Sequence, residues 1–298
     1  MELAKKQCLI NRFKTWGWVF LYLIAWIVTI IILSTPFRLI FGENKVFNSQ
    51  TLFSLLQQLL ILLATLLVTI LFCNFVHKEK LTDIGLNDIK ARQKDLLFGL
   101  LYGLLPISVG FMLFYAVGLI RITEIRFISD ILFSFILFVM VAFNEEIMLR
   151  GYVLRRFMTS YNKYIALIIS SALFMLMHVF NGNISFLGMF NIFLAGMLLG
   201  MYYIHRQNLW FPIGLHFTWN FFQGPVFGFA VSGETIASNI IKQQSISEKD
   251  WLTGGAFGFE GSAIASIIVI ILIIVVHFQY RKKHLISPVS EGNHNEIN

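Results

Sequence analysis

Residues 16–34 read WGWVFLYLIAWIVTIIILS and contain no charged side chain. A helix that crosses the hydrocarbon core of a bilayer needs about 20 apolar residues, whereas the apolar part of a signal peptide has about 7 to 15. We therefore predict a transmembrane helix here. Seven further apolar runs follow it: 52–76, 96–120, 131–149, 164–180, 186–204, 209–231 and 263–278. The pattern predicts an all-α, polytopic bundle of about eight membrane-spanning helices.

The composition also indicates a membrane protein. Hydrophobic residues make up 57% of the chain and charged residues 13%, and the mean hydropathy is +0.74. A soluble protein has about 25% charged residues, so a soluble globular domain is excluded. The two cysteines, Cys8 and Cys73, lie in a short basic segment and in an apolar run. Neither a disulfide framework nor a cysteine-based zinc site is therefore expected.

Lysine and arginine predict the orientation, because cytoplasmic loops carry an excess of these residues. With the N-terminus inside, the segments on the inner side hold 16 of them and the segments on the outer side hold 6. Both termini are therefore predicted to face the cytoplasm. This bias also accounts for the formal net charge of +7, so we expect no nucleic-acid partner.

Ionisable residues inside the apolar runs are informative, because a charge at the centre of a bilayer costs roughly 2.5 to 3.5 kcal/mol. Glu145, Glu146 and Arg150 gather near the end of the run at 131–149. Glu146 and Arg150 are four residues apart on one helical face, so we predict an ion pair between them. Glu145 points about 100° away and lacks that partner, which suits a carboxylate that accepts a proton in catalysis. The structural alternative is that both acids lie at the membrane interface.

His178 lies one helical turn after Phe174, so the phenyl ring is predicted to pack against the imidazole. The midpoint between Glu145 and His178 falls in the polar segment 159–162, which predicts the turn of a helical hairpin. The carboxylate and the imidazole would then lie at the same height on facing helices and share one water. The structural alternative for this histidine is core packing or an interhelical hydrogen bond.

His216 and Asn220 are also four residues apart, so both side chains project from one helical face. Together they offer two hydrogen-bond donors for a developing oxyanion, a kind of contact that contributes roughly 2.7 to 4 kcal/mol to a transition state. The structural alternative is a polar seam that holds helices together. The segment Gly196-Met197-Leu198-Leu199-Gly200 is a GxxxG helix-contact motif without chemistry of its own.

Taken in order, three motifs resemble those of the CPBP intramembrane proteases. They are Glu-Glu-x-x-x-Arg at 145–150, Phe-x-x-x-His at 174–178 and His-x-x-x-Asn at 216–220. That group contains CAAX prenyl endopeptidases, bacteriocin-processing and self-immunity (Abi) proteins and lysostaphin-resistance-like proteins. The resemblance covers about residues 131–226 and includes the spacing of the motifs. It implies a multi-pass intramembrane endopeptidase, expected in a bacterial cell membrane.

The resemblance also implies roles for the motif residues. Glu145 and His178 would activate a water, and His216 and Asn220 would stabilise the oxyanion. The supporting residues would be Glu146, Arg150 and Phe174. We accordingly expect four regions: N-terminal transmembrane helices at 1–130, the protease core at 131–226, an outer loop and the last transmembrane helix at 227–283, and a polar tail at 284–298.

The resemblance leaves the metal dependence open. Glu145, His178 and His216 form a His₂Glu set that suits zinc. However, the His-Glu-x-x-His signature is absent, and a water that Glu and His activate together needs no metal. We therefore favour catalysis without a cofactor and keep zinc as the alternative.

Two other functions stay open. One is a non-proteolytic membrane scaffold or bacteriocin-immunity protein of the same fold, and the other is a transporter with a proton relay through Glu145 and His178. Against the transporter, the two halves of the chain show no pair of broken helices in corresponding positions. The expected partners are membrane lipid and a membrane-associated peptide or protein substrate, whose identity the sequence does not reveal.

Overall fold

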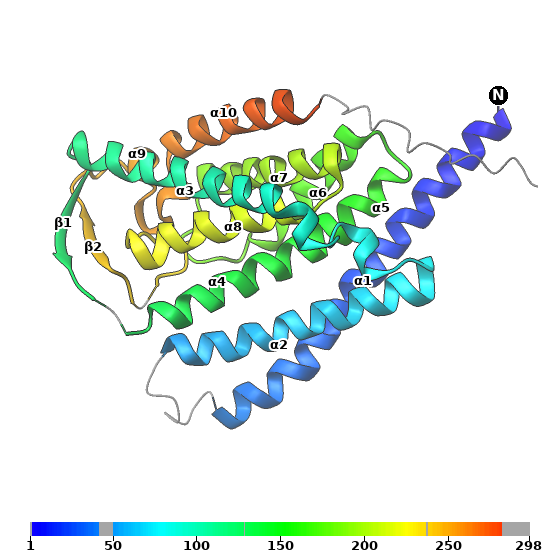
Figure 1. Ribbon diagram of the computed structural model, residues 1–298, viewed down its shortest axis with the longest axis horizontal. Helices are drawn as coiled ribbons and strands as arrows, with labels where there is room; N and C mark the ends of the chain where they lie inside the picture. Colours follow the sequence, from blue (N-terminus) through cyan, green and yellow to red (C-terminus); the bar gives the residue numbers. More distant parts are fainter. Residues whose placement is uncertain (1, 42–49, 128, 237, 282–298) are drawn as a thin grey trace, which may run out of the picture.

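The computed structural model describes residues 2–41, 50–127, 129–236 and 238–281, and the polar tail expected at 284–298 lies outside the described residues. Within that part of the chain, long helices run roughly along one direction and form a bundle (Figure 1). The first two are α1 (Glu2–Phe41) and α2 (Gln50–Leu71), and α1 crosses α2 obliquely. The other long helices are α3 (Gln93–Ala116), α4 (Ile131–Glu146), α6 (Lys163–Met177), α7 (Phe186–Arg206), α8 (Trp210–Phe221) and α10 (Ala263–Tyr280).

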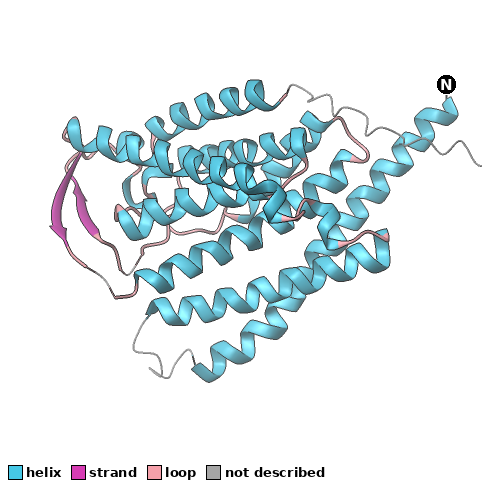
Figure 2. Ribbon diagram, in the orientation of Figure 1, coloured by secondary structure: helices cyan, strands magenta, loops and turns pink. Residues whose placement is uncertain are grey.

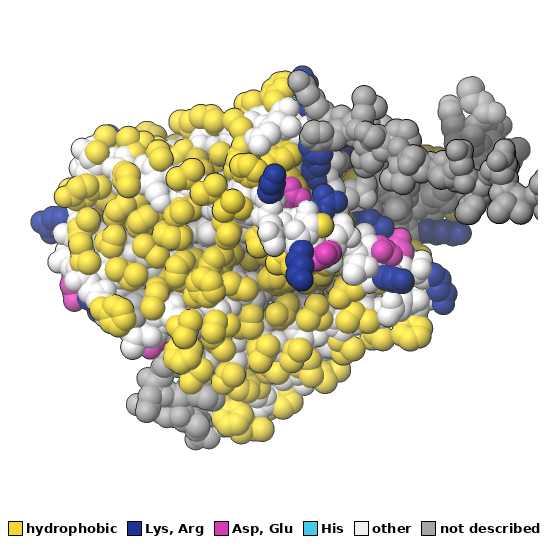
Figure 3. Space-filling view, viewed as in Figure 1, with side chains coloured by type: hydrophobic (Ala, Val, Ile, Leu, Met, Phe, Trp, Pro, Cys, Tyr) yellow, Lys and Arg dark blue, Asp and Glu magenta, His cyan; other side chains and the backbone are white. Residues whose placement is uncertain are grey.

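Six helical stretches of the described chain are long and apolar enough to cross a membrane. They are Lys6–Phe41, Leu52–His77, Leu81–Ala116, Ile131–Met158, Phe186–Arg206 and Ala263–Tyr280. The chain is therefore an all-α membrane helix bundle, as predicted. Space-filling Figure 3 agrees, because hydrophobic side chains cover the middle of the visible face and charged side chains gather towards its ends.

Two of the eight predicted spans are shorter than expected. The run at 164–180 forms α6, which has 15 residues, and the run at 209–231 forms α8, which has 12 and continues as a π-helix over Phe222–Val226. At 1.5 Å per residue, neither α-helix reaches the roughly 30 Å of a hydrocarbon core. For α8, hydropathy alone overestimated the length because this helix is buried among other helices, and a buried helix is as apolar as one that faces lipid.

A small sheet lies at one end of the bundle, where the sequence predicted only loops (Figure 2). β1 (Ile120–Ile125) pairs antiparallel with β2 (Ile241–Ser245), and the pairing shifts register between Ile122 and Glu124. The end of α3 and the starts of α4 and α10 lie at this same end (Figure 1). The described segments predicted to be outer therefore gather together, opposite the segments predicted to be inner.

An ion-paired cluster lies at the opposite end. The Oε2 atom of Glu79 is 2.6 Å from Nη2 of Arg156 and 3.4 Å from Nε of Arg155, at the start of α5 (Arg155–Met158). Partial burial alone would raise the pKa of the Glu79 carboxyl, but the hydrogen bond from Arg156 and the charges of both arginines outweigh it and lower that pKa. These contacts hold the segment that follows α2 against α5.

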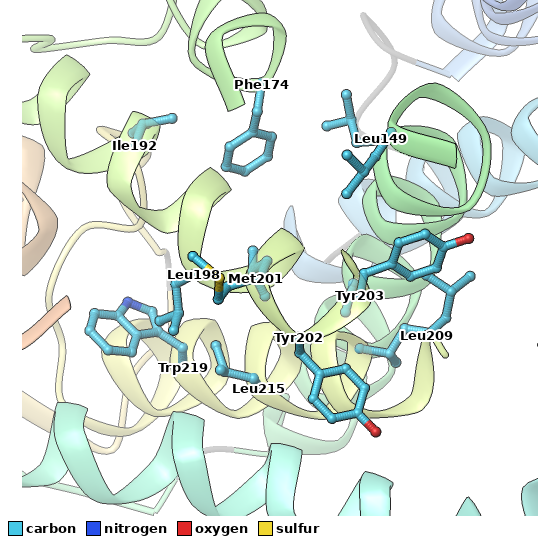
Figure 4. Close-up of a cluster of buried hydrophobic side chains, with 14 of the residues drawn as sticks. Leu149, Phe174, Ile192, Leu198, Met201, Tyr202, Tyr203, Leu209, Leu215 and Trp219 are labelled. Carbon is cyan, nitrogen blue, oxygen red and sulfur yellow. The ribbon is translucent and has the colours of Figure 1, made fainter. Parts of the chain in front are cut away.

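Close helix packing holds α8 and α7 in place around the centre of the bundle. On α3, a Cβ added to Gly103 would lie 2.2 Å from Oγ1 of Thr218, so only glycine permits this approach to α8. On α7, a Cβ added to Gly196 would lie 3.0 Å from the backbone of Ser171 on α6. The GxxxG segment is thus a helix contact, as predicted. Figure 4 shows the apolar side chains that fill the space between these helices.

Candidate active site

The two glutamates lie at the end of α4, directly before a stretch of π-helix over Ile147–Leu154 that is buried throughout. Single π-helical turns inside helices are frequent at functional sites, because the wider turn redirects the side chains next to it. Asn144 and Thr65 hydrogen-bond to each other and so join this part of α4 to α2. The π-helix after Glu146 and the hydrogen bond between Asn144 and Thr65 therefore both position the two carboxylates.

Glu146 and Arg150 form the predicted ion pair. The Nη1 atom of Arg150 donates to Oε1 of Glu146 over 2.9 Å, and the two side chains are 1% and 0% exposed. Arg150 also donates from Nη2 to the backbone carbonyl of Gly196 over 3.3 Å, and its guanidinium lies 4.6 Å from the ring centroid of Phe174. A fully buried cation is costly unless it is paired and hydrogen-bonded, and here it is both.

His216 contacts both glutamates, which the sequence did not predict. Its Nδ1 atom is 2.8 Å from Oε1 of Glu146, and its Nε2 atom is 3.7 Å from Oε2 of Glu145. Because an ionised carboxylate only accepts, the Nδ1 proton of His216 is donated to Glu146. The buried Glu146 is therefore shared by Arg150 and His216, and it turns the other imidazole nitrogen towards Glu145.

His178 is held in one orientation by its own helix. It caps the C-terminus of α6, and its ring meets the ring of Phe174 edge to face at 4.6 Å between centroids, as predicted. The Nδ1 atom lies 2.8 Å from the backbone carbonyl of Phe174. A carbonyl only accepts, so Nδ1 carries the proton, and in the neutral ring Nε2 keeps a lone pair.

The predicted hairpin is also present. Its first arm runs through α4, the π-helix and α5 to Met158, and its second arm is α6, which begins after the cap residue Asn162. Ser170 in the second arm donates to the carbonyl of Leu149 in the first over 3.3 Å. Glu145 from the first arm and His178 at the end of the second arm both line one cavity.

The cavity has a volume of about 450 Å³, and all four predicted catalytic residues line it: Glu145, His178, His216 and Asn220. Asn220 is 8% exposed, and its carboxamide makes no hydrogen bond to any other residue that the structure describes. Apolar side chains form much of the remaining wall. Figure 4 shows several of them, including Leu198 and Leu215.

Part of the cavity wall was missed by the sequence analysis. The residues in question are Ser54 of α2, Ser134 of α4, Asn191 of α7, Glu260, and Val231, Ser232, Glu234, Thr235 and Ile236 of the loop after α8. The loop is held by Glu260, whose Oε2 atom accepts from the backbone and the hydroxyl of Ser232 over 2.8 and 2.9 Å. Asn181 also donates to the carbonyl of Ser232 over 2.8 Å. No periodic signal marks such a loop, because its position depends on partners distant in sequence.

The described residues contain no group of three or more His, Cys, Asp or Glu side chains arranged to hold a metal ion. Glu145 and His216 approach each other. The Nδ1 atom of His216 is hydrogen-bonded to Glu146, and the Nδ1 atom of His178 is hydrogen-bonded to a backbone carbonyl. A zinc ion would use the remaining Nε2 atoms of these histidines together with Glu145.

Comparison with protein families returned a match to the model of the Rce1-like family, described as type II CAAX prenyl endopeptidase Rce1-like, over residues 127–222. Comparisons with curated proteins and with solved structures gave no match. The matched segment begins before α4 and ends after α8, so it contains the three motifs and the helices that carry them. Over about a third of its length the chain is therefore similar to the Rce1-like type II CAAX prenyl endopeptidases, which confirms the resemblance of its three motifs to this group of proteases.

Proposed function

We propose that the protein is an intramembrane endopeptidase that hydrolyses a peptide bond of a membrane-associated protein or peptide. The main support is that one cavity inside a largely apolar helix bundle is lined by four polar residues, Glu145, His178, His216 and Asn220. Buried polar groups are costly in such surroundings unless they are hydrogen-bonded, and a catalytic role accounts for those that are not. The family match supports the same reaction class.

Glu145 is the proposed general base, with His178 beside the same water. The Oε2 atom of Glu145 is buried and has no hydrogen-bond partner among the described residues, so it can accept one from a water in the cavity. The Nε2 lone pair of His178 is a second acceptor, since Nδ1 already donates to Phe174. A water that donates to both acceptors has its oxygen lone pairs free for attack on a carbonyl carbon.

Asn220 and His216 are the proposed oxyanion donors. The carboxamide of Asn220 supplies an N–H group, and this group is available because it makes no hydrogen bond to a residue that the structure describes. His216 donates from Nε2 when the ring carries both protons, and Glu146 holds its Nδ1 side in place. Arg150 and Phe174 act as positioning residues, because they fix Glu146 and the ring of His178.

These groups can accept and return every proton that the reaction moves. The base takes one proton from water as the C–O bond forms, and the tetrahedral intermediate carries its negative charge on the former carbonyl oxygen. The C–N bond then breaks, and the proton held by Glu145 or His178 passes to the leaving amine. No step requires a metal, and we propose that the enzyme acts without one.

The substrate is proposed to reach the cavity from the membrane, with lipid as the surrounding partner and the bacterial cell membrane as the location. A CAAX prenyl substrate, as named for the family, is one member of this class.

The test is peptidomics of membranes from cells that express the wild-type protein or the Glu145→Gln variant. A peptide that appears only with the wild type would identify both the substrate and the reaction. Glu124→Gln is the matched control, because Glu124 is exposed on β1 and the change removes the same charge. Identical peptide profiles for wild type and Glu145→Gln would instead favour the scaffold, and proton or solute flux in sealed vesicles would favour the transporter.

A further inference from the structure

A cluster of nitrogen-bearing side chains lies at the end of the bundle opposite the small sheet, away from the proposed active site. The Nζ atom of Lys163, the first residue of α6, is 3.2 Å from Nδ1 of His205 near the end of α7. The Nε2 atom of His205 is 3.4 Å from Nδ1 of His277 on α10. All three side chains are half-buried. The ends of three helices therefore meet in one chain of polar contacts.

The direction of donation along this chain is determined by chemistry. An ammonium group has only donors, so Nδ1 of His205 must accept from Lys163. A neutral His205 then carries its proton on Nε2 and donates it to Nδ1 of His277. His277 consequently carries its own proton on Nε2. This row of hydrogen bonds therefore has a free donor at each end. These donors are the remaining N–H groups of Lys163 and the Nε2–H group of His277.

The cluster has no anion of its own among the described residues. The ionisable groups whose charges act on His205 are Lys163, His277 and Arg206, and none of them is a carboxylate. Arg206 makes no side-chain hydrogen bond or ion pair with a described residue, and its buried Nε atom lacks a partner. Asp95, on α3 at the same end, is already engaged by Arg92 at 3.6 Å and by Asn208 at 2.9 Å.

The surroundings suit a lipid molecule. Lys163 begins α6, and Arg206 ends α7, so the cluster lies where these helices leave the apolar part of the bundle. The faces of the two helices next to it are apolar and exposed: Tyr164, Ile165 and Ile168 on α6, and Ile270, Ile274 and Phe278 on α10. Tyr164 packs near both histidines, at 6.3 and 5.9 Å between ring centroids, as tyrosines do at membrane interfaces.

We propose that Lys163, His277 and Arg206 bind the phosphate group of an anionic phospholipid, with its acyl chains on the exposed faces of α6 and α10. Phosphate oxygens accept the hydrogen bonds that the free donors offer, and the negative charge balances Lys163 and Arg206. Basic pockets between membrane helices on the cytoplasmic side are suited to such headgroups. This end of the bundle is the one that the lysine and arginine bias assigns to the cytoplasm.

The test is native mass spectrometry of the full chain in neutral detergent, titrated with phosphatidylglycerol, with diacylglycerol as a lipid without phosphate. The wild type should retain phosphatidylglycerol and not diacylglycerol. Lys163→Gln should raise the apparent Kd for phosphatidylglycerol roughly tenfold, as expected for one lost charge-assisted contact. Lys163→Arg should bind nearly as the wild type does, and its melting temperature should confirm that it folds.

Lys249→Gln is the matched control, because Lys249 is exposed beyond β2 and the change removes one positive charge at the end of the bundle that carries the small sheet. It should leave the Kd unchanged. Equal affinity of wild type and Lys163→Gln, or binding of diacylglycerol as tight as that of phosphatidylglycerol, would overturn the proposal. Inorganic phosphate should displace the lipid only at millimolar concentration. Displacement at the concentration of the lipid itself would assign the cluster to a soluble anion and overturn the lipid assignment.

Discussion

His216 donates a hydrogen bond from Nδ1 to Oε1 of Glu146 over 2.8 Å, although the two residues are 70 positions apart. The same oxygen accepts from Arg150 over 2.9 Å. Glu146 is therefore more than the counterion of an arginine, because it also determines which nitrogen of His216 faces the cavity. The two adjacent glutamates consequently differ in what their loss should do.

Glu145→Gln is expected to abolish cleavage while leaving insertion and stability nearly unchanged. The change is almost isosteric, the side chain is 21% exposed, and Nε2 of His216 is 3.7 Å from its Oε2 atom, beyond hydrogen-bond distance. The loss of a general base alone costs about 100- to 10,000-fold in rate. A reconstituted cleavage assay with melting curves measures both quantities. Cleavage at the wild-type rate would refute the assignment of Glu145 as the base.

Glu146→Gln is expected to reduce stability by roughly 3 to 5 kcal/mol, because it removes the ion-pair partner of the buried Arg150. Adding Arg150→Met should recover much of that stability, since it removes the uncompensated charge. Turnover should stay low in the double variant, because His216 still lacks its carboxylate partner. Melting temperatures and cleavage rates of the three proteins separate the two effects. A double variant as unstable as Glu146→Gln would contradict the ion-pair argument.

Asn220→Ala is expected to lower kcat by roughly 100- to 1,000-fold with little change in KM, as for one lost oxyanion donor. Stability should change little, because the carboxamide makes no hydrogen bond to the described residues. Steady-state kinetics on a synthetic substrate provide the measurement. A rise in KM at constant kcat would instead indicate that Asn220 binds the substrate in its ground state.

Chelator treatment is expected to leave activity intact. The reason is that Glu145 and His178 can together take a proton from water without a metal. The measurement is cleavage by purified protein after prolonged exposure to a strong chelator, alongside metal analysis. Stoichiometric zinc that is lost together with activity, and that restores activity on readdition, would show that the proposal is wrong.

Cysteine labelling of intact cells is expected to show that the end with the small sheet faces outward. In a Cys8→Ser background, a cysteine at Lys242 on β2 should react with an impermeant reagent, whereas a cysteine at Lys94 should not. The remaining Cys73 is buried and should stay silent. Labelling at position 94 without labelling at 242 would reverse the predicted orientation.

Much of the candidate site follows from the sequence because its contacts are local. A helix has about 3.6 residues per turn, so residues four apart share a face whatever the rest of the chain does. The Glu146–Arg150 ion pair and the packing of Phe174 against His178 are contacts of this kind. The apolar runs likewise predict membrane helices, because the bilayer core admits little else.

Tertiary structure alone decided the contacts between helices. These contacts depend on how far each helix is rotated and shifted along its neighbour. Examples are the hydrogen bond from His216 to Glu146, the bonds that hold the loop around Ser232, and the hydrogen bonds that link Lys163, His205 and His277. Close approaches such as that of Gly196 to Ser171 determine those shifts. Helix periodicity defines the face of the helix on which a residue lies. It does not define which face of a neighbouring helix that residue contacts, because this depends on the packing of side chains distant in sequence.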